Sequence, residues 1–134
     1  MTGLEHKNRR ASLASTCLAT QPRPHYVHFA DSTAVVDEER NLRAMGGIVP
    51  QEGPDTMTLQ CLPLYTLLLA LGNPTVNWFI LDIEGAEFQV LQTIPWQLVD
   101  IEMISVETDM AGLVMPGSRQ EIIEYMQSQG YHHR

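Results

Sequence analysis

The chain has 134 residues, a net charge of -8 and 44% hydrophobic residues, which fits one folded domain and excludes a disordered chain. This acidity excludes nucleic acid as a preferred partner, and no basic cluster is present that would dock on anionic lipid. The longest apolar run, 62–71, is shorter than the roughly 20 residues of a membrane span, and the N-terminus lacks the apolar core of a signal peptide.

The first third of the chain predicts a polar helix end and short strands. Residues 3–10 have the polar character of a helix end, and 11–19 are small and apolar, as in a short buried strand. In residues 25–30 polar and apolar side chains alternate and several are β-forming, which predicts a half-exposed strand. We expect 31–33 to form a turn, after which 34–36 return antiparallel.

The middle of the chain interrupts this pattern. Residues 37–55 contain charged residues, a Gly-Gly pair and two prolines, and we expect a long flexible loop, functional or disordered. Residues 56–61 predict a strand. Pro63 then opens a helix over 64–71, and Gly72 ends it.

The second half alternates strands with helices. Residues 76–83 are almost continuously apolar, which is typical of a central parallel strand buried on both faces, and Trp78 is expected in the core. Residues 84–93 carry apolar side chains at helical spacing up to the proline that precedes Trp96, which we expect to be partly exposed.

A second strand and helix follow. Residues 101–107 predict a strand, and Ser118 with Glu121 forms a capping box that begins a helix over 119–129, with Gly130 as its C-terminal cap. Strands that alternate with helices imply a parallel sheet with right-handed crossovers. The fold class is therefore α/β, doubly wound.

Acidic residues follow the two strands of this half. Asp82 ends the strand 76–83, Glu84, Gly85 and Glu87 open the next helix, and Glu107 ends the neighbouring strand. Ligands of open α/β sheets bind at the carboxyl ends of the strands, so these residues are candidates for a site. The alternative is structural: Asp82 caps the helix and the glutamates complement its dipole.

The remaining candidates are weaker. His25 and His28 are three apart on a strand and point to opposite faces, so no metal site is expected. Cys17 and Cys61 form neither a disulfide framework nor a metal motif, and we expect free thiols that serve as core residues in an intracellular or lumenal domain. No nucleophile elbow, Walker loop or GxGxxG motif occurs.

The motif Asp-Ile-Glu-Gly-Ala-Glu at 82–87 resembles that of the FkbM-type S-adenosylmethionine-dependent methyltransferases. Residues 7–18, 61–70 and 93–101 are similar to the animal branch of that family that includes the insect Star protein. The stretches 116–119 and 130–131 also fit this branch.

The resemblance implies a Rossmann-like class I methyltransferase sheet. The family's glycine-rich loop, which holds the methionine part of the cofactor, and its acidic ribose-binding strand end have no counterpart here. Residues 1–134 therefore resemble a partial domain without the N-terminal strands and the final strand pair, and we expect this chain alone to be inactive.

The resemblance also assigns roles to residues. It makes Asp82 the catalytic candidate, Glu87 a substrate-binding or structural residue, and the following set cofactor-binding: Ser15, Cys17, Asp82, Glu84 and Gly85. Glu107 is a substrate-binding or structural candidate from its place at a strand end. Ser15 stands where this branch is expected to carry Asn.

Two functions follow from the resemblance. The first is O-methyl transfer from S-adenosyl-L-methionine to a small-molecule or glycan acceptor. The alternative is a non-catalytic, Star-like interaction role in membrane trafficking, with protein cargo and a membrane-associated location in the secretory and endosomal pathway. A third outcome is a fragment whose open sheet edges promote aggregation.

Overall fold

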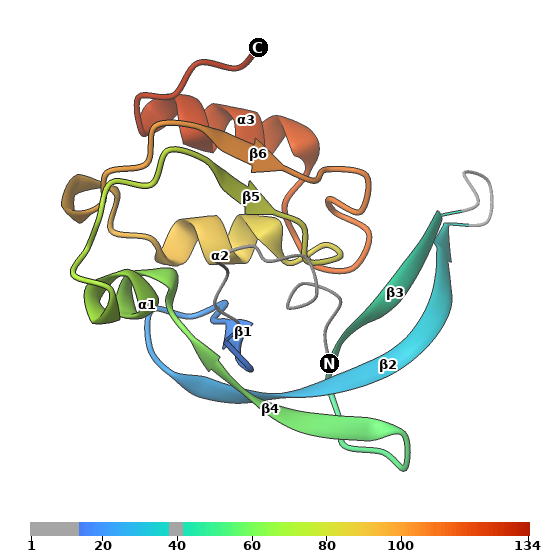
Figure 1. Ribbon diagram of the computed structural model, residues 1–134. Helices are drawn as coiled ribbons and strands as arrows, with labels where there is room; N and C mark the ends of the chain where they lie inside the picture. Colours follow the sequence, from blue (N-terminus) through green and yellow to red (C-terminus); the bar gives the residue numbers. More distant parts are fainter. Residues whose placement is uncertain (1–13, 38–41) are drawn as a thin grey trace, which may run out of the picture.

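The computed structural model describes residues 14–37 and 42–134 as a mixed α/β fold (Figure 1). The described strands are β1 (Cys17–Leu18), β2 (His25–Asp37), β3 (Leu42–Val49), β4 (Thr56–Leu62), β5 (Phe79–Leu81) and β6 (Ile104–Val106). The described helices are α1 (Leu64–Ala70), α2 (Glu87–Thr93) and α3 (Arg119–Ser128). One sheet has the order β1-β4-β2-β3, and a second pairs β5 with β6 in parallel. The expected helix end at 3–10 lies outside the described residues, as does the start of the strand expected at 11–19.

The four-stranded sheet is built around β2, which continues through the turn expected at 31–33. Strand β2 pairs antiparallel with β4 over His25–Ala30 and with β3 on both sides of residues 31–32, so the chain continues as one strand. The return predicted at 34–36 is therefore wrong. The strand that returns is β3, and the register between β2 and β3 shifts between Ala30 and Thr33, where the expected turn lies.

Residues 42–49, expected inside a long loop, instead form β3. The Gly-Gly pair that favoured a loop lies within the strand. Gly46 has a φ of +107°, and a Cβ there would come within 2.7 Å of the Phe29 ring on β2. Glycine thus allows a close approach of two strands at this point instead of marking a loop.

The expectation of free cysteines is wrong. Strands β1 and β4 pair in parallel with Cys17 directly opposite Cys61, and the two Cα atoms are 4.4 Å apart. At this separation the sulfurs form a disulfide, which joins segments 44 residues apart in the sequence. Cys61 is fully buried, so the residue does belong to the interior, as a disulfide partner.

The helix-rich half agrees closely with its sequence pattern. The strand at 56–61 and the helix that follows Pro63 are confirmed, as is the capping box, in which the Glu121 N–H bonds to the Ser118 Oγ while the Glu121 carboxylate accepts the Ser118 N–H. A single core joins the three helices to β5, with these buried members: Leu64, Leu68, Leu81, Val90, Leu91, Ile94, Ile101, Ile122 and Met126.

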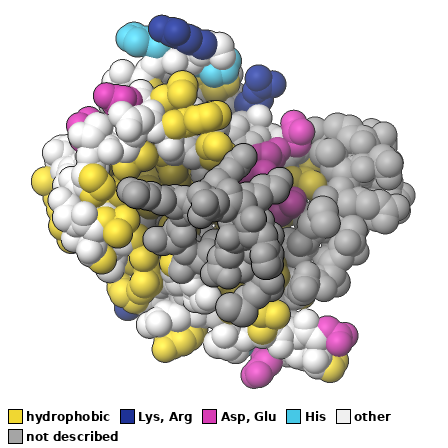
Figure 2. All heavy atoms as spheres, viewed as in Figure 1, with side chains coloured by type: hydrophobic (Ala, Val, Ile, Leu, Met, Phe, Trp, Pro, Cys, Tyr) yellow, Lys and Arg dark blue, Asp and Glu magenta, His cyan; other side chains and the backbone are white. Residues whose placement is uncertain are grey.

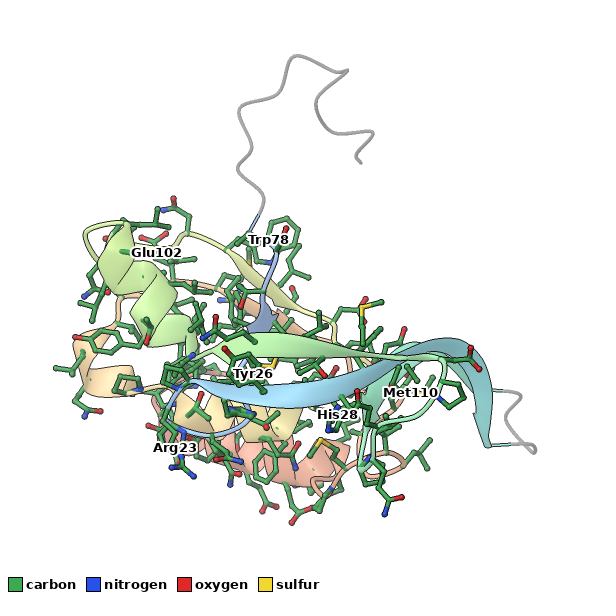
Figure 3. All side chains as sticks on the ribbon, turned by 90° about the horizontal axis from the view of Figure 1, so that it is seen from below. Arg23, Tyr26, His28, Trp78, Glu102 and Met110 are labelled. Carbon is green, nitrogen blue, oxygen red and sulfur yellow. A yellow bond between two sulfur atoms is a disulfide. The ribbon has the colours of Figure 1, made fainter. Side chains whose placement is uncertain are left out.

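The sheet of β5 and β6 is covered on one face only in the described part of the chain. Leu81 is buried against α2 and α3, whereas Trp78 and Ile80 are 56% and 61% exposed on the opposite face. Figure 3 shows Trp78 on the side of β5 away from these helices. The prediction of a strand buried on both faces, with Trp78 in the core, is therefore wrong, because an apolar run has no period that reveals an uncovered face.

Trp96, by contrast, is half-buried as expected. Its ring packs edge-on against Tyr131 at 5.6 Å between centroids, and its Nε1 donates to the Tyr125 hydroxyl at 3.1 Å. Of the helices in residues 14–37 and 42–134, none has both the length and the hydropathy to cross a membrane.

Candidate active site

Asp82 and Glu107 lie at the same edge of the two-stranded sheet. The register pairs Leu81 with Val106, and the Glu107 N–H donates to the Leu81 carbonyl at 2.9 Å. The two acidic residues therefore follow β5 and β6 at equivalent positions, as the sequence predicted. Asp82 is exposed and Glu107 is half-buried, so this carboxyl edge presents one free carboxylate beside one partly enclosed carboxyl group.

The turn between β5 and α2 is formed by two consecutive residues in the left-handed region. Glu84 has a φ of +61° and Gly85 a φ of +102°. Helix α2 then begins at Glu87, with Ala86 as an N-cap that makes no side-chain hydrogen bond. Two expectations are corrected: Glu84 lies before the helix instead of in its first turn, and Asp82 does not cap it.

Glu87 holds this turn from inside the protein. Its side chain is 1% exposed, and its Oε1 accepts the N–H of Ile83 at 2.8 Å and the N–H of Gly85 at 3.2 Å. A non-glycine residue in the left-handed region costs of order 1 kcal/mol or more, so the turn needs such support. Glu87 therefore stabilises the turn, whereas the exposed Asp82 side chain makes no hydrogen bond among the described residues.

Glu107 is held differently. Its Oε1 accepts the Asp109 N–H, while its Oε2 is buried with no hydrogen-bond partner among the described residues. Burial raises the pKa of Glu107 above its usual value of 4.5, partly opposed by the hydrogen bond from Asp109, and the Glu87 charge raises it further. A carboxyl group with a raised pKa and an unpaired oxygen can donate or accept a proton at this edge.

The segment after Glu107 folds back over the start of α2. A Cβ on Gly85 would come within 2.9 Å of the Val114 Cβ, and a Cβ on Gly117 would overlap the Phe88 side chain. The Gln89 side chain adds a hydrogen bond to the Pro116 carbonyl. Gly85 therefore allows an internal close approach, which accounts for this glycine without a ligand.

The other predicted cofactor residues lie on the other sheet. Ser15 is exposed before β1, and Cys17 is in the disulfide, so it offers no thiol. In the described part of the chain no hydrogen bond connects either residue to Asp82. The structure thus brings Asp82, Glu84, Gly85, Glu87 and Glu107 together and leaves Ser15 and Cys17 apart from them.

An open cavity of about 610 Å³ lies beside this edge and reaches Val106 and Thr108, which flank Glu107. It is lined by β6, by α3 and by the C-terminal segment 130–134, and none of the predicted site residues lines it. The sequence predicts β6 and α3 as separate elements, but hydrophobic periodicity does not show whether the side chains of two neighbouring elements leave a gap between them. This cavity was therefore missed.

The fold is mixed α/β, and Asp82 and Glu107 lie at the carboxyl ends of its parallel strands, the edge at which open α/β sheets bind ligands. The model of the methyltransferase FkbM domain matches residues 5–132, and the chain belongs to that family. No curated protein and no solved structure matches the chain.

Proposed function

We propose that this domain takes part in O-methyl transfer from S-adenosyl-L-methionine, with Asp82 as the reacting carboxylate. Membership of a methyltransferase family supports methyl transfer as the class of reaction. We choose Asp82 because its side chain is exposed at the carboxyl end of β5. The nearby Glu87 is less suitable, because its carboxylate accepts hydrogen bonds from the backbone. An acidic side chain that is exposed at a strand end and does not cap the following helix is available to a ligand.

The chemistry of the residues fits part of this cofactor. S-Adenosyl-L-methionine supplies a methyl group on a positively charged sulfonium and also presents an ammonium and two ribose hydroxyls. Asp82 and Glu107 offer carboxyl oxygens, which attract cations and accept hydrogen bonds from hydroxyls. The chain has no glycine-rich GxGxxG or GxGxG loop for the methionine part, so these residues hold only part of the group.

Asp82 would receive the proton of the acceptor. A hydroxyl that gains a methyl group loses its proton, and an exposed carboxylate within reach accepts it as a general base. Glu107 is less suited to this role, because its Oε2 is buried and burial raises its pKa above the usual value.

The test compares two Asp→Asn variants at exposed positions. Asp82→Asn should keep the free energy of unfolding within about 1 kcal/mol, since the side chain is exposed, and should abolish methyl transfer in the full-length protein. Asp55→Asn, at another exposed position, should keep both. Thermal melting and a radiolabelled methyl-transfer assay measure the two properties. Full activity in Asp82→Asn would show that the motif is structural.

A separate titration addresses the cofactor. Isothermal titration of S-adenosyl-L-methionine into the 134-residue chain should give weak binding or none, because the glycine loop is absent. Low-micromolar affinity would show that this chain is sufficient for binding without the glycine loop, contrary to this expectation.

We propose as a second candidate a Star-like interaction role in the secretory and endosomal pathway, for which the disulfide supports the compartment alone. Disulfides persist in oxidising compartments and are rare in the cytosol. The bond between Cys17 and Cys61 is therefore the observation that supports this location. Alkylation of the protein in its native cells should leave both cysteines protected; two alkylated thiols would contradict an oxidising compartment.

A further inference from the structure

Glu87 is a buried acidic side chain that the proposed proton transfer does not use. It is the first residue of α2 and is 1% exposed, and among the residues whose burial is described it is the one charged side chain that is buried. Taking a charge out of water is costly unless hydrogen bonds or an opposite charge compensate. The role of Glu87 therefore depends on what its carboxylate binds.

One oxygen of Glu87 holds two peptide groups of the turn between β5 and α2. The Oε1 atom accepts the Ile83 N–H at 2.8 Å and the Gly85 N–H at 3.2 Å. A backbone N–H lies in the same rigid plane as the Cα and the carbonyl group of the preceding residue. The first bond therefore fixes the peptide plane that begins at Asp82, and the second fixes the plane that begins at Glu84.

The peptide plane on the other side of Asp82 is held by the strand pairing. The Glu107 N–H donates to the Leu81 carbonyl at 2.9 Å, and this carbonyl lies in the plane that joins Leu81 to Asp82. Asp82 is therefore between two fixed peptide planes, which together determine its φ and ψ. With both backbone angles set, the Cα–Cβ bond of Asp82 has one direction, and only rotation within the side chain remains free.

The outer side of the turn is closed by the segment 110–114. A Cβ at Gly85 would come within 2.9 Å of the Val114 Cβ and within 3.2 Å of the Met110 carbonyl oxygen, so the turn has little room to move away from Glu87. Figure 2 shows acidic side chains gathered on the side of the molecule where Figure 1 places the carboxyl ends of β5 and β6. Glu87 thus holds, from inside the protein, a turn that lies at this acidic edge.

We propose that Glu87 is a positioning residue, whose hydrogen bonds fix the backbone that follows Asp82 and so set the direction of the Asp82 carboxylate toward the acceptor hydroxyl. This proposal rests on the proposed function, in which Asp82 receives the proton of the acceptor. A general base acts within hydrogen-bond reach of the proton that it removes, and a displacement of about 1 Å can cost on the order of 100-fold in rate. The geometry of the two hydrogen bonds carries this role, and the charge of Glu87 does not.

Two substitutions of similar length separate the hydrogen bonds from packing and charge. Glu87→Gln retains an oxygen that can accept both N–H groups, whereas Glu87→Met fills the same space without an oxygen. In the 134-residue chain, residual dipolar couplings of the Asp82 Cα should be the same in the wild type and in Glu87→Gln, and should change in Glu87→Met. The Ile83 and Gly85 amides should exchange slowly in the wild type and in Glu87→Gln, and about tenfold faster or more in Glu87→Met.

Kinetics of the full-length protein test the consequence for the reaction, with radiolabelled S-adenosyl-L-methionine as donor and methyl α-D-mannoside as the hydroxyl probe. Glu87→Met should lower kcat by about 10- to 100-fold with little change in KM for the donor. Glu87→Gln should keep kcat within about threefold, because a neutral oxygen still accepts both bonds. Val90→Ala, fully buried on the same helix, is the control for stability: its melting temperature should fall and its kcat should stay unchanged.

Three results would overturn the proposal. The first is fast exchange of the Ile83 and Gly85 amides in the wild type, which needs no substitution. The second is the same Asp82 couplings in Glu87→Met as in the wild type. The third is an unchanged kcat in Glu87→Met while Asp82→Asn is inactive, which leaves the proposed function intact. Failure of the proposed function is seen separately, as full activity of Asp82→Asn, and it removes the positioning role together with the reaction.

Discussion

Buried side chains are distributed unevenly between the two sheets. All nine buried members of the core cluster lie between Leu64 and Met126, around β5 and the three helices. In the sheet half (residues 16–62) the buried hydrophobic side chains include Ala19 and Cys61, and Tyr26 and Met57 are exposed. Among the residues whose burial is described, apolar burial is therefore concentrated in the helix-rich half (residues 63–131), whereas the four strands of the sheet half are joined by backbone ladders and one disulfide.

This difference shows that the two halves of the chain are stabilised in different ways. Apolar burial stabilises in proportion to the area removed from water, and the core cluster of the described residues lies in the helix-rich half. The Cys17–Cys61 disulfide lies within the sheet half, where it links β1 to β4 directly before α1. Leu18, the neighbour of Cys17 on β1, packs against the core cluster of the helix-rich half.

The largest expected effect is in the core of the helix-rich half. Leu81→Ala removes a side chain that is 1% exposed and leaves a cavity, so the free energy of unfolding should fall by about 2–5 kcal/mol. Ile80→Ala, one residue away on the open face, should cost less than about 1 kcal/mol. Urea denaturation of the two variants measures both. Equal losses would mean that β5 is covered on both faces.

The disulfide gives the next largest effect. Reduction, or the double variant Cys17→Ser/Cys61→Ser, should lower the free energy of unfolding by about 2–4 kcal/mol, because the unfolded chain loses a constraint across 44 residues. Hydrogen exchange should rise first in β2 and β4 and only later in α3. Uniform exchange across both halves would show that the two halves unfold as one unit.

A smaller effect is expected at the start of α3. Ser118→Ala removes the side chain that accepts the Glu121 N–H, which should cost about 1 kcal/mol. Ser128→Ala, near the other end of the same helix, is the control. Circular dichroism melting should separate the two variants, and an identical melting temperature would mean that the capping box adds nothing to the helix.

The smallest effect concerns pH. Because the pKa of Glu107 is raised in the folded protein, its stabilising contribution is complete below the ordinary value of 4.5 and is lost as the pH rises through the folded pKa. Glu107→Gln keeps an acceptor for the Asp109 N–H and removes the charge, so its melting temperature should decline less over this range. Glu102→Gln should retain the wild-type profile; a parallel change there would assign the pH dependence to net charge.

The helix-rich half could be predicted because its signals are local. The capping box at Ser118, the proline before α1 and the apolar spacing of α2 each depend on residues a few positions apart. The sheet half depends on pairing between distant residues. Nothing near 42–49 indicates that β2 will pair with it, and nothing near Cys17 indicates that Cys61 will lie opposite.

The candidate site divides in the same way. The positions of Asp82 and Glu107 follow from the ends of two apolar runs, so the sequence was sufficient to find them. The internal role of Glu87 was not predictable, because it depends on the left-handed conformation of Glu84 and Gly85. The exposure of Trp78 was not predictable either, since it depends on which elements cover the sheet.

The contact between Gly117 and Phe88 has a consequence for sequence change. Since a Cβ at 117 would overlap the Phe88 side chain, and Phe88 itself packs edge-on against Tyr125 with 5.7 Å between ring centroids, the large ring and the absent side chain form a matched pair. A side chain at position 117 is not tolerated beside Phe88, but it can be accommodated when a smaller residue replaces Phe88. Covariation between positions 88 and 117 among homologous sequences, with a small residue at 88 wherever 117 is not glycine, is the pattern that this contact would leave in evolution.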